Sequence, residues 1–145
     1  MQVKFLSIFV AAIMVLAIPV QSMAKDGLFI VRQIDKMPEV FVQSVEDYAK
    51  KKDWNYLGAS KVKKGEITLV KFCITEVGKQ LWQQGLYLSA MAPCGNIGVY
   101  RKEGETEISV LNPRYMNILA PSPEMEKISV LAETQMLEML DELAK

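Results

Sequence analysis

The hydrophobic and polar positions of this chain change period several times, and each change predicts a new element of secondary structure. Short apolar or alternating runs predict strands: the first starts at Leu28 and ends before Pro38, and others cover residues 54–62, 67–74 and both arms of a hairpin over 96–111. The strand at 67–74 is apolar on both faces, so we expect it inside the sheet and not at an edge. Glu103-Gly104 stands where the hairpin needs its tight turn.

Three other segments place apolar residues three and four positions apart, which is the spacing of an amphipathic helix. The first runs from Pro38 to Lys52, the second has Thr75 as its N-cap and stops at Gly85, and the third occupies 123–143. The residues predicted to face the core are Phe41, Val45, Tyr48 and Ala49; Val77 and Leu81; and Met125, Ile128, Ala132, Met136, Met139, Leu140 and Leu143. The order strand, helix, two strands, helix, hairpin, helix predicts an α+β fold, with helices packed on one face of a mostly antiparallel sheet.

The first 24 residues have the three parts of a secretory signal peptide. Lys4 gives a positive start, an apolar run of 16 residues covers 5–20, and small residues at Ser22 and Ala24 precede the predicted cut after Ala24. A retained membrane anchor is the alternative, but the run is shorter than the ~20 residues that span a bilayer. We therefore expect one domain over residues 25–145, periplasmic or secreted, without a stable membrane anchor after cleavage.

Composition narrows the classes of function. The mature chain would carry 16 basic and 17 acidic residues, whereas a nucleic-acid-binding surface needs an excess of positive charge. The chain contains no histidine, so a Ser-His-Asp triad or a Cys-His pair cannot be built, and the commonest metal ligand is absent. We expect no nucleic-acid partner and no cofactor, and an enzymatic function is disfavoured.

The chain resembles a known family over most of its length. Three features carry the resemblance: a cysteine that closes a strand before a short helix, a Pro-Cys pair that leads into the next strand, and an Asn-Pro pair that ends a hairpin. They are Cys73, Ala92-Pro93-Cys94 and Asn112-Pro113. In these features the chain resembles the family called domain of unknown function 302, over most of residues 28–143. The resemblance implies a small α+β domain that tends to form homodimers, and it implies no reaction.

Cys73 and Cys94 are the only cysteines of the chain, and three interpretations compete. In a small exported domain an even number of cysteines favours a structural disulfide. The two could instead be reduced and buried as small apolar side chains. They could also be a working pair in thiol redox chemistry, sulfur transfer or soft-metal binding, because a helix N-terminus beside Cys73 would lower its pKa.

Two further groups of residues are candidates for binding. Met136 and Met139 lie one helical turn apart and could hold a soft metal, although their place on one apolar stripe favours core packing. Trp54, Tyr56 and Tyr87 could line a ligand cleft, although aromatic residues of strands more often belong to the core.

Together these features predict a small exported binding or interaction domain, a homodimer whose ligand is an unidentified small molecule or protein. The alternative is a thiol-dependent redox, sulfur-transfer or soft-metal-binding protein that uses Cys73 and Cys94. A thiol that opens into a cleft would favour the alternative, whereas buried cysteines with no cleft would favour a structural role.

We predict that the mature protein begins at Lys25, because signal peptidase cuts after small residues such as Ala24. Protein exported by its native host should have the mass of residues 25–145 in mass spectrometry. Protein recovered from membranes with Met1 intact would contradict the prediction.

Overall fold

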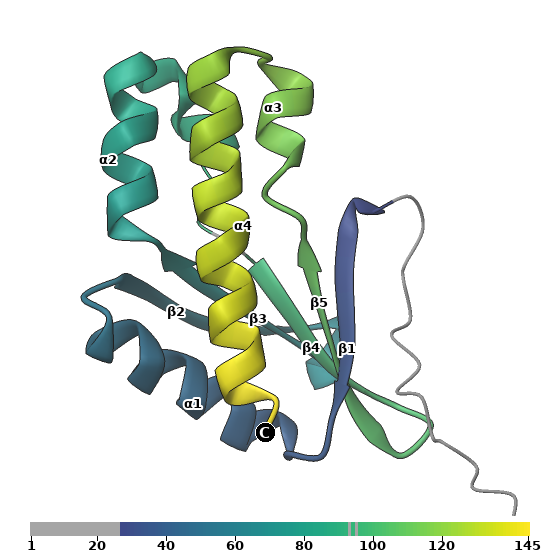
Figure 1. Ribbon diagram of the computed structural model, residues 1–145. Coiled ribbons are helices and arrows are strands. Elements are labelled where there is room, and N and C mark those ends of the chain that lie inside the picture. Colours follow the sequence, from purple (N-terminus) through teal and green to yellow (C-terminus); the bar gives the residue numbers. More distant parts are fainter. Residues whose placement is uncertain (1–26, 93, 95) are drawn as a thin grey trace, which may run out of the picture.

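The computed structural model describes residues 27–92, 94 and 96–145, so the predicted signal peptide lies outside the described residues. Within them the chain forms five strands and four α-helices, with short 3₁₀ helices between some of them (Figure 1). In chain order the elements are β1 (Phe29–Ile34), α1 (Pro38–Lys51), β2 (Asn55–Val62), η2 (Lys63–Gly65), β3 (Ile67–Cys73), α2 (Thr75–Gln84), η3 (Leu86–Met91), β4 (Asn96–Lys102), β5 (Glu105–Leu111), α3 (Tyr115–Leu119) and α4 (Pro123–Leu143). None of the described helices is long and apolar enough to cross a membrane.

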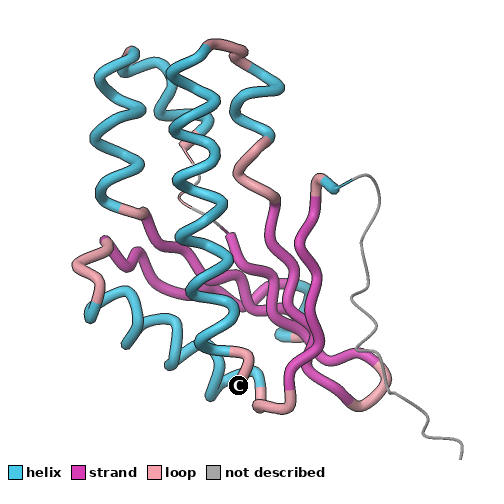
Figure 2. Tube along the Cα trace, viewed as in Figure 1, coloured by secondary structure: helices cyan, strands magenta, loops and turns pink. Residues whose placement is uncertain are grey.

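All five strands pair antiparallel, in the order β1-β5-β4-β3-β2 (Figure 2). β3 lies between β4 and β2, as its two apolar faces predict. β4 and β5 form the predicted hairpin, and both residues of its turn have positive φ angles, 53° at Glu103 and 91° at Gly104. A two-residue turn of this kind matches the right-handed twist of the paired strands, which is why glycine suits the second position.

The helices lie on one face of the sheet, and the core lies between them and the strands. Figure 1 shows α4 in front of the strands, with α2 and α3 beside its N-terminal half and α1 beside its C-terminal half. The strand residues that point toward the helices are buried: Val70, Phe72, Ile97, Val99, Ile108 and Val110. All residues of the stripes predicted on α1 and on α4 are buried as well. The predicted fold class is therefore confirmed.

The predicted start of α2 is wrong by one residue. Ile74 occupies the N-cap position and Thr75 is the first helical residue. The Thr75 hydroxyl does not cap the helix but donates a hydrogen bond of 2.7 Å to the carbonyl oxygen of Asp53. This bond ties the start of α2 to the turn between α1 and β2, a contact that spacing along the chain cannot reveal.

Two short helices, η3 and α3, have no counterpart in the sequence prediction. They contain six and five residues, which is too short for an apolar repeat to stand out from the surrounding loops. Both connect the sheet to longer helices, η3 after α2 and α3 before α4.

The reverse side of the sheet, here called the open face, combines apolar and polar side chains. Its apolar members are Phe29, Val31, Ile67, Leu69 and Leu111. Between them the Tyr100 hydroxyl donates a hydrogen bond of 2.5 Å to Glu107, and burial together with this carboxylate raises the pKa of the Tyr100 phenol. Gly98 makes room for the Ser109 side chain on the neighbouring strand, since a Cβ at position 98 would come within 2.9 Å of the Ser109 hydroxyl oxygen.

Candidate functional site

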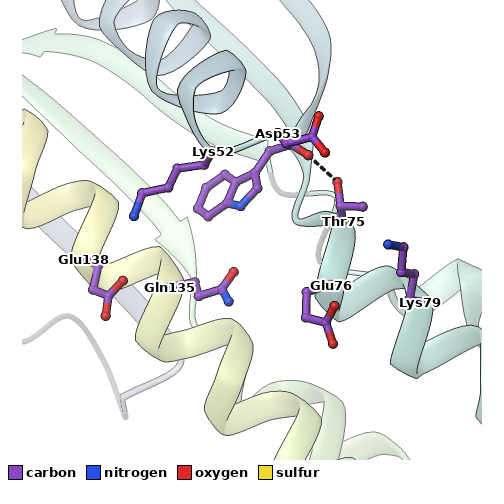
Figure 3. Close-up of a pocket in the computed structure, with 8 residues that line it drawn as sticks. Lys52, Asp53, Thr75, Glu76, Lys79, Gln135 and Glu138 are labelled. Carbon is purple, nitrogen blue, oxygen red and sulfur yellow. Dashed lines mark hydrogen bonds between the residues drawn. The ribbon is translucent and has the colours of Figure 1, made fainter.

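A cleft of about 320 Å³ lies where the end of α1, the start of α2 and the middle of α4 come together (Figure 3). One aromatic residue and seven polar or charged residues line it: Trp54, Lys52, Asp53, Thr75, Glu76, Lys79, Gln135 and Glu138. They come from three segments that are far apart in the sequence. Polar side chains that converge on a concave surface are typical of small-molecule sites.

Trp54 forms the rigid wall of the cleft. Its indole stacks on the Phe72 ring, with the ring centroids 5.4 Å apart and the planes inclined by 12°. Tyr48 meets the same indole edge-on, also with a centroid distance of 5.4 Å. Since Phe72 and Tyr48 belong to the buried core, these contacts fix the indole, and the part of its surface that they leave uncovered faces the cleft.

The turn between α1 and β2 places Trp54 in the cleft wall. α1 ends there because Asp53 has a φ angle of 56°, a left-handed conformation that a right-handed helix cannot continue. The backbone N–H of Trp54 donates a hydrogen bond of 2.8 Å to the carbonyl oxygen of Ala49, and the hydroxyl of Thr75 reaches the Asp53 carbonyl from α2. The turn is therefore held from both sides of the cleft.

The charged residues of the cleft have both signs. Two are basic and three are acidic: Lys52, Lys79, Asp53, Glu76 and Glu138. Within the part of the chain that the structure describes, none of the five forms an ion pair. The Gln80 amide donates a hydrogen bond of 2.7 Å to Glu76, which orients one carboxylate without neutralising it. Lys52 lies over the Tyr48 ring, with its Nζ atom 5.5 Å from the ring centroid. The cleft thus presents charges of both signs that have no ion-pair partner among the described residues.

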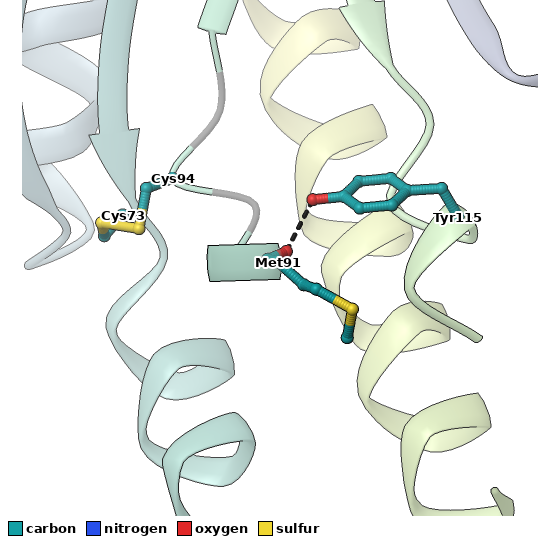
Figure 4. Close-up of a disulfide and its surroundings, with 4 residues drawn as sticks. All are labelled: Cys73, Met91, Cys94 and Tyr115. Carbon is teal, nitrogen blue, oxygen red and sulfur yellow. Dashed lines mark hydrogen bonds between the residues drawn. A yellow bond between two sulfur atoms is a disulfide. The ribbon is translucent and has the colours of Figure 1, made fainter. Parts of the chain in front are cut away.

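Cys73 and Cys94 form a disulfide, with their Cα atoms 4.2 Å apart (Figure 4). The bridge joins the end of β3 to the segment that precedes β4, and both cysteines are half-buried. The structure therefore contains the two cysteines in the bridged form and not as free thiols. Because Cys73 lies two residues before Thr75, the bridge also fixes the start of α2 at the edge of the cleft.

Tyr115 anchors the loop that the disulfide closes. Its hydroxyl donates a hydrogen bond of 2.6 Å to the carbonyl oxygen of Met91, at the end of η3 (Figure 4). Burial raises the pKa of the Tyr115 phenol. The bridge and this hydrogen bond together hold the segment between α2 and β4.

The chain matches a known family and a solved structure. The family described as Domain of unknown function DUF302 matches residues 30–143. This chain belongs to the DUF302 family. The crystal structure of an uncharacterized conserved protein DUF302 from Bacillus stearothermophilus has a similar fold, with a TM-score of 0.71 and 14% sequence identity over 81% of this chain and 98% of that chain. No curated protein matches the chain.

Of the three aromatic candidates, only Trp54 lines the cleft of this DUF302 domain. Tyr56 lies opposite Phe72 in the β2–β3 pair and is half-buried, outside the cleft wall. Tyr87 lies on η3 and is 80% exposed. The three residues therefore do not form one site, and ligand binding by the cleft stays a prediction.

Met136 and Met139 are fully buried in the core of the DUF302 domain. This is the placement that the packing interpretation predicts for two residues on one apolar stripe. Among the described residues, no group of three or more His, Cys, Asp or Glu side chains could hold a metal ion.

The polar residues of the cleft carry only a weak signal in the sequence. Glu76 and Lys79 lie three positions apart on α2, and Gln135 and Glu138 lie three apart on α4, so each pair shares one side of its helix. Each pair stands beside a buried apolar stripe. Such pairs are the signal that could have pointed to the cleft, but solvated helix faces carry the same pattern.

We predict that loss of the disulfide destabilises the DUF302 domain. Cys73→Ser, Cys94→Ser and the double variant should each lower the free energy of unfolding by about 3 kcal/mol, which is the chain-entropy effect of opening a loop of this length. Equilibrium urea denaturation measures the loss. Equal losses in all three variants identify the bridge as the common cause, whereas unchanged stability in both single variants would rule out a stabilising bridge.

Proposed function

We propose that this DUF302 domain is an exported, non-catalytic binding module that holds a small polar molecule in the cleft beside Trp54. The observation that carries the proposal is the cleft itself, in which charged side chains without ion-pair partners among the described residues surround a rigid indole. Its volume of about 320 Å³ lies at the lower end of the range of ligand sites, about 300–1,000 Å³. The expected ligand is correspondingly small.

The residues of the cleft favour binding over catalysis. The chain has no histidine to act as a general base. Among the described lining residues the only hydroxyl is that of Thr75, and it donates a hydrogen bond to the backbone carbonyl oxygen of Asp53. A hydroxyl becomes a nucleophile when an adjacent base takes its proton, and a backbone carbonyl is not such a base.

Two features support export. The N-terminal residues have the charge, apolar run and small residues of a signal peptide. The disulfide is the second feature, because disulfides persist in oxidising compartments and are rare where glutathione and thioredoxin keep thiols reduced.

A thiol-based function is the second candidate, and the partial exposure of the disulfide favours it. Both cysteines are only half-buried, so we expect a small dithiol reductant to reach the bridge. Reduction would release the Cys73 thiol at the N-terminus of α2, where the helix dipole favours a thiolate. The pair would then be suited to redox chemistry, sulfur transfer or soft-metal binding.

We also propose that the domain is a homodimer formed through the open face. Phe29 and Leu111 lie directly opposite each other on that face and are 49% and 41% exposed. Covering them with a second copy would remove apolar surface from water. Lys102 and Glu105 also lie opposite each other on this face, and Lys102 pairs with Glu107 of its own chain at 3.3 Å. A symmetric partner would bring a second charge of each sign to this part of the face, so unlike charges can be placed together.

We predict that filling the cleft abolishes ligand binding. Gln135→Phe adds a ring to the α4 wall of the cleft, whereas Thr134→Phe adds the same ring to an exposed position of α4 and is the matched control. In ¹⁹F NMR screening of a fluorinated fragment library, fragments should bind the wild type and Thr134→Phe but not Gln135→Phe. Fragments that bind all three proteins equally, or a library without a single hit, would count against the cleft as a binding site.

We predict a dimer of the mature domain in light scattering at tens of micromolar, a rough threshold set by typical affinities. Phe29→Lys should convert it to a monomer, because it places a charge in the apolar part of the open face. Val40→Lys is the control, since Val40 is exposed to a similar extent, 52%, but lies on α1. A wild-type monomer, or a dimer that Phe29→Lys leaves intact, would overturn the proposed interface.

A further inference from the structure

We infer that the cleft beside Trp54 is built for a small aromatic zwitterion, a molecule with one aromatic ring, an ammonium group and a carboxylate, such as an aromatic amino acid. This inference rests on the proposed binding function and adds the chemical class of the ligand. Three properties of the cleft carry it: the fixed indole, the arrangement of its charges and its size.

The indole of Trp54 favours an aromatic ligand. Phe72 stacks on it from the core, so the ring cannot turn away when the cleft is empty. A preorganised indole loses little conformational freedom when a ligand binds. Aromatic rings gain additional attraction from offset or edge-on contacts at centroid distances of about 4.5–7 Å. A ligand ring in the cleft would thus extend a cluster of rings that the fold already holds in place.

The charges of the cleft favour a ligand that carries both signs. Figure 3 shows Lys52 and Glu138 on one side of the cleft and Glu76 and Lys79 on the other. With Asp53, the lining offers two cations and three anions, so both signs are present on either side of the cleft. A purely anionic ligand would satisfy the lysines and be repelled by the carboxylates, and a purely cationic ligand would meet the opposite mismatch. A zwitterion can place each of its charged groups beside a group of opposite sign.

The size of the cleft sets an upper limit on the ligand. A cavity of about 320 Å³ is at the small end of known ligand sites, which suits one ring with a short charged chain and excludes a long peptide or a polysaccharide from full burial. Gln135 adds an amide to the α4 wall, which can donate to a carboxylate or accept from an ammonium group.

Trp54 itself provides the measurement. The chain has two tryptophans, and Trp82 lies outside the cleft with 44% of its surface exposed, so Trp82→Phe leaves Trp54 as the single indole. The Trp82→Phe protein is titrated with four probes: L-phenylalanine, 3-phenylpropionate, 2-phenylethylamine and L-leucine. Binding is followed by the fluorescence of Trp54, excited at 295 nm (roughly where only indole absorbs). Calorimetry is the second readout. L-phenylalanine should bind saturably, and each of the other three probes, which lack one recognised group, should bind about tenfold more weakly or worse.

Charge variants complete the test. Lys79→Met and Glu138→Gln should each weaken L-phenylalanine binding about tenfold, whereas Lys127→Met, an exposed lysine of α4 outside the cleft, should leave it unchanged. Equal binding of 2-phenylethylamine or of 3-phenylpropionate would overturn the zwitterion assignment, and equal binding of L-leucine would overturn the aromatic one. If no probe binds while fluorinated fragments still distinguish Gln135→Phe from Thr134→Phe, the ligand class is wrong and the binding function stands; if neither binds, both are wrong.

Discussion

Burial of one face of a five-stranded sheet is the constraint on which the rest of this DUF302 domain depends. The helices cover that face, and the apolar stripes of α1 and α4 meet the strands in a single core. The cleft lies where this cover ends, because the polar residues that α2 and α4 turn toward each other, among them Lys79 and Gln135, do not close into an apolar contact. The uncovered side of the sheet leaves Phe29 and Leu111 exposed, which is the basis of the proposed dimer.

Four successive residues connect the core to the cleft. Phe72 supports the indole of Trp54, Cys73 carries the disulfide, Ile74 is buried at the N-cap of α2, and the Thr75 hydroxyl holds the turn that ends α1. Sheet, loop, helix and turn are therefore fixed within one short segment. A cleft supported in this way is preorganised, and preorganisation lowers the entropic cost of binding a small ligand.

Most of the fold could be predicted from the sequence, but little of the cleft could be. The hairpin, the internal position of β3 and the buried stripe of α4 follow from local periodicity and turn chemistry, so they could be predicted from the sequence. The cleft depends instead on contacts between segments that are far apart, such as the hydrogen bond from Thr75 to Asp53. Its polar residues look like those of any solvated helix face until the fold brings them together. Tyr87 lies on η3, whose formation local periodicity does not predict, and its side chain is exposed outside the cleft lining.

If the cleft is a binding site, the protein should carry a small molecule there when it is isolated from its host. Native mass spectrometry of the mature protein, purified from its natural compartment without added ligand, tests it most directly. We expect the wild type to show a species with an added mass that collisional activation releases as one small molecule, and we expect Gln135→Phe prepared in the same way to lack it. A wild-type protein that shows only the bare mass of the polypeptide, or an adduct that Gln135→Phe retains in full, would contradict the account.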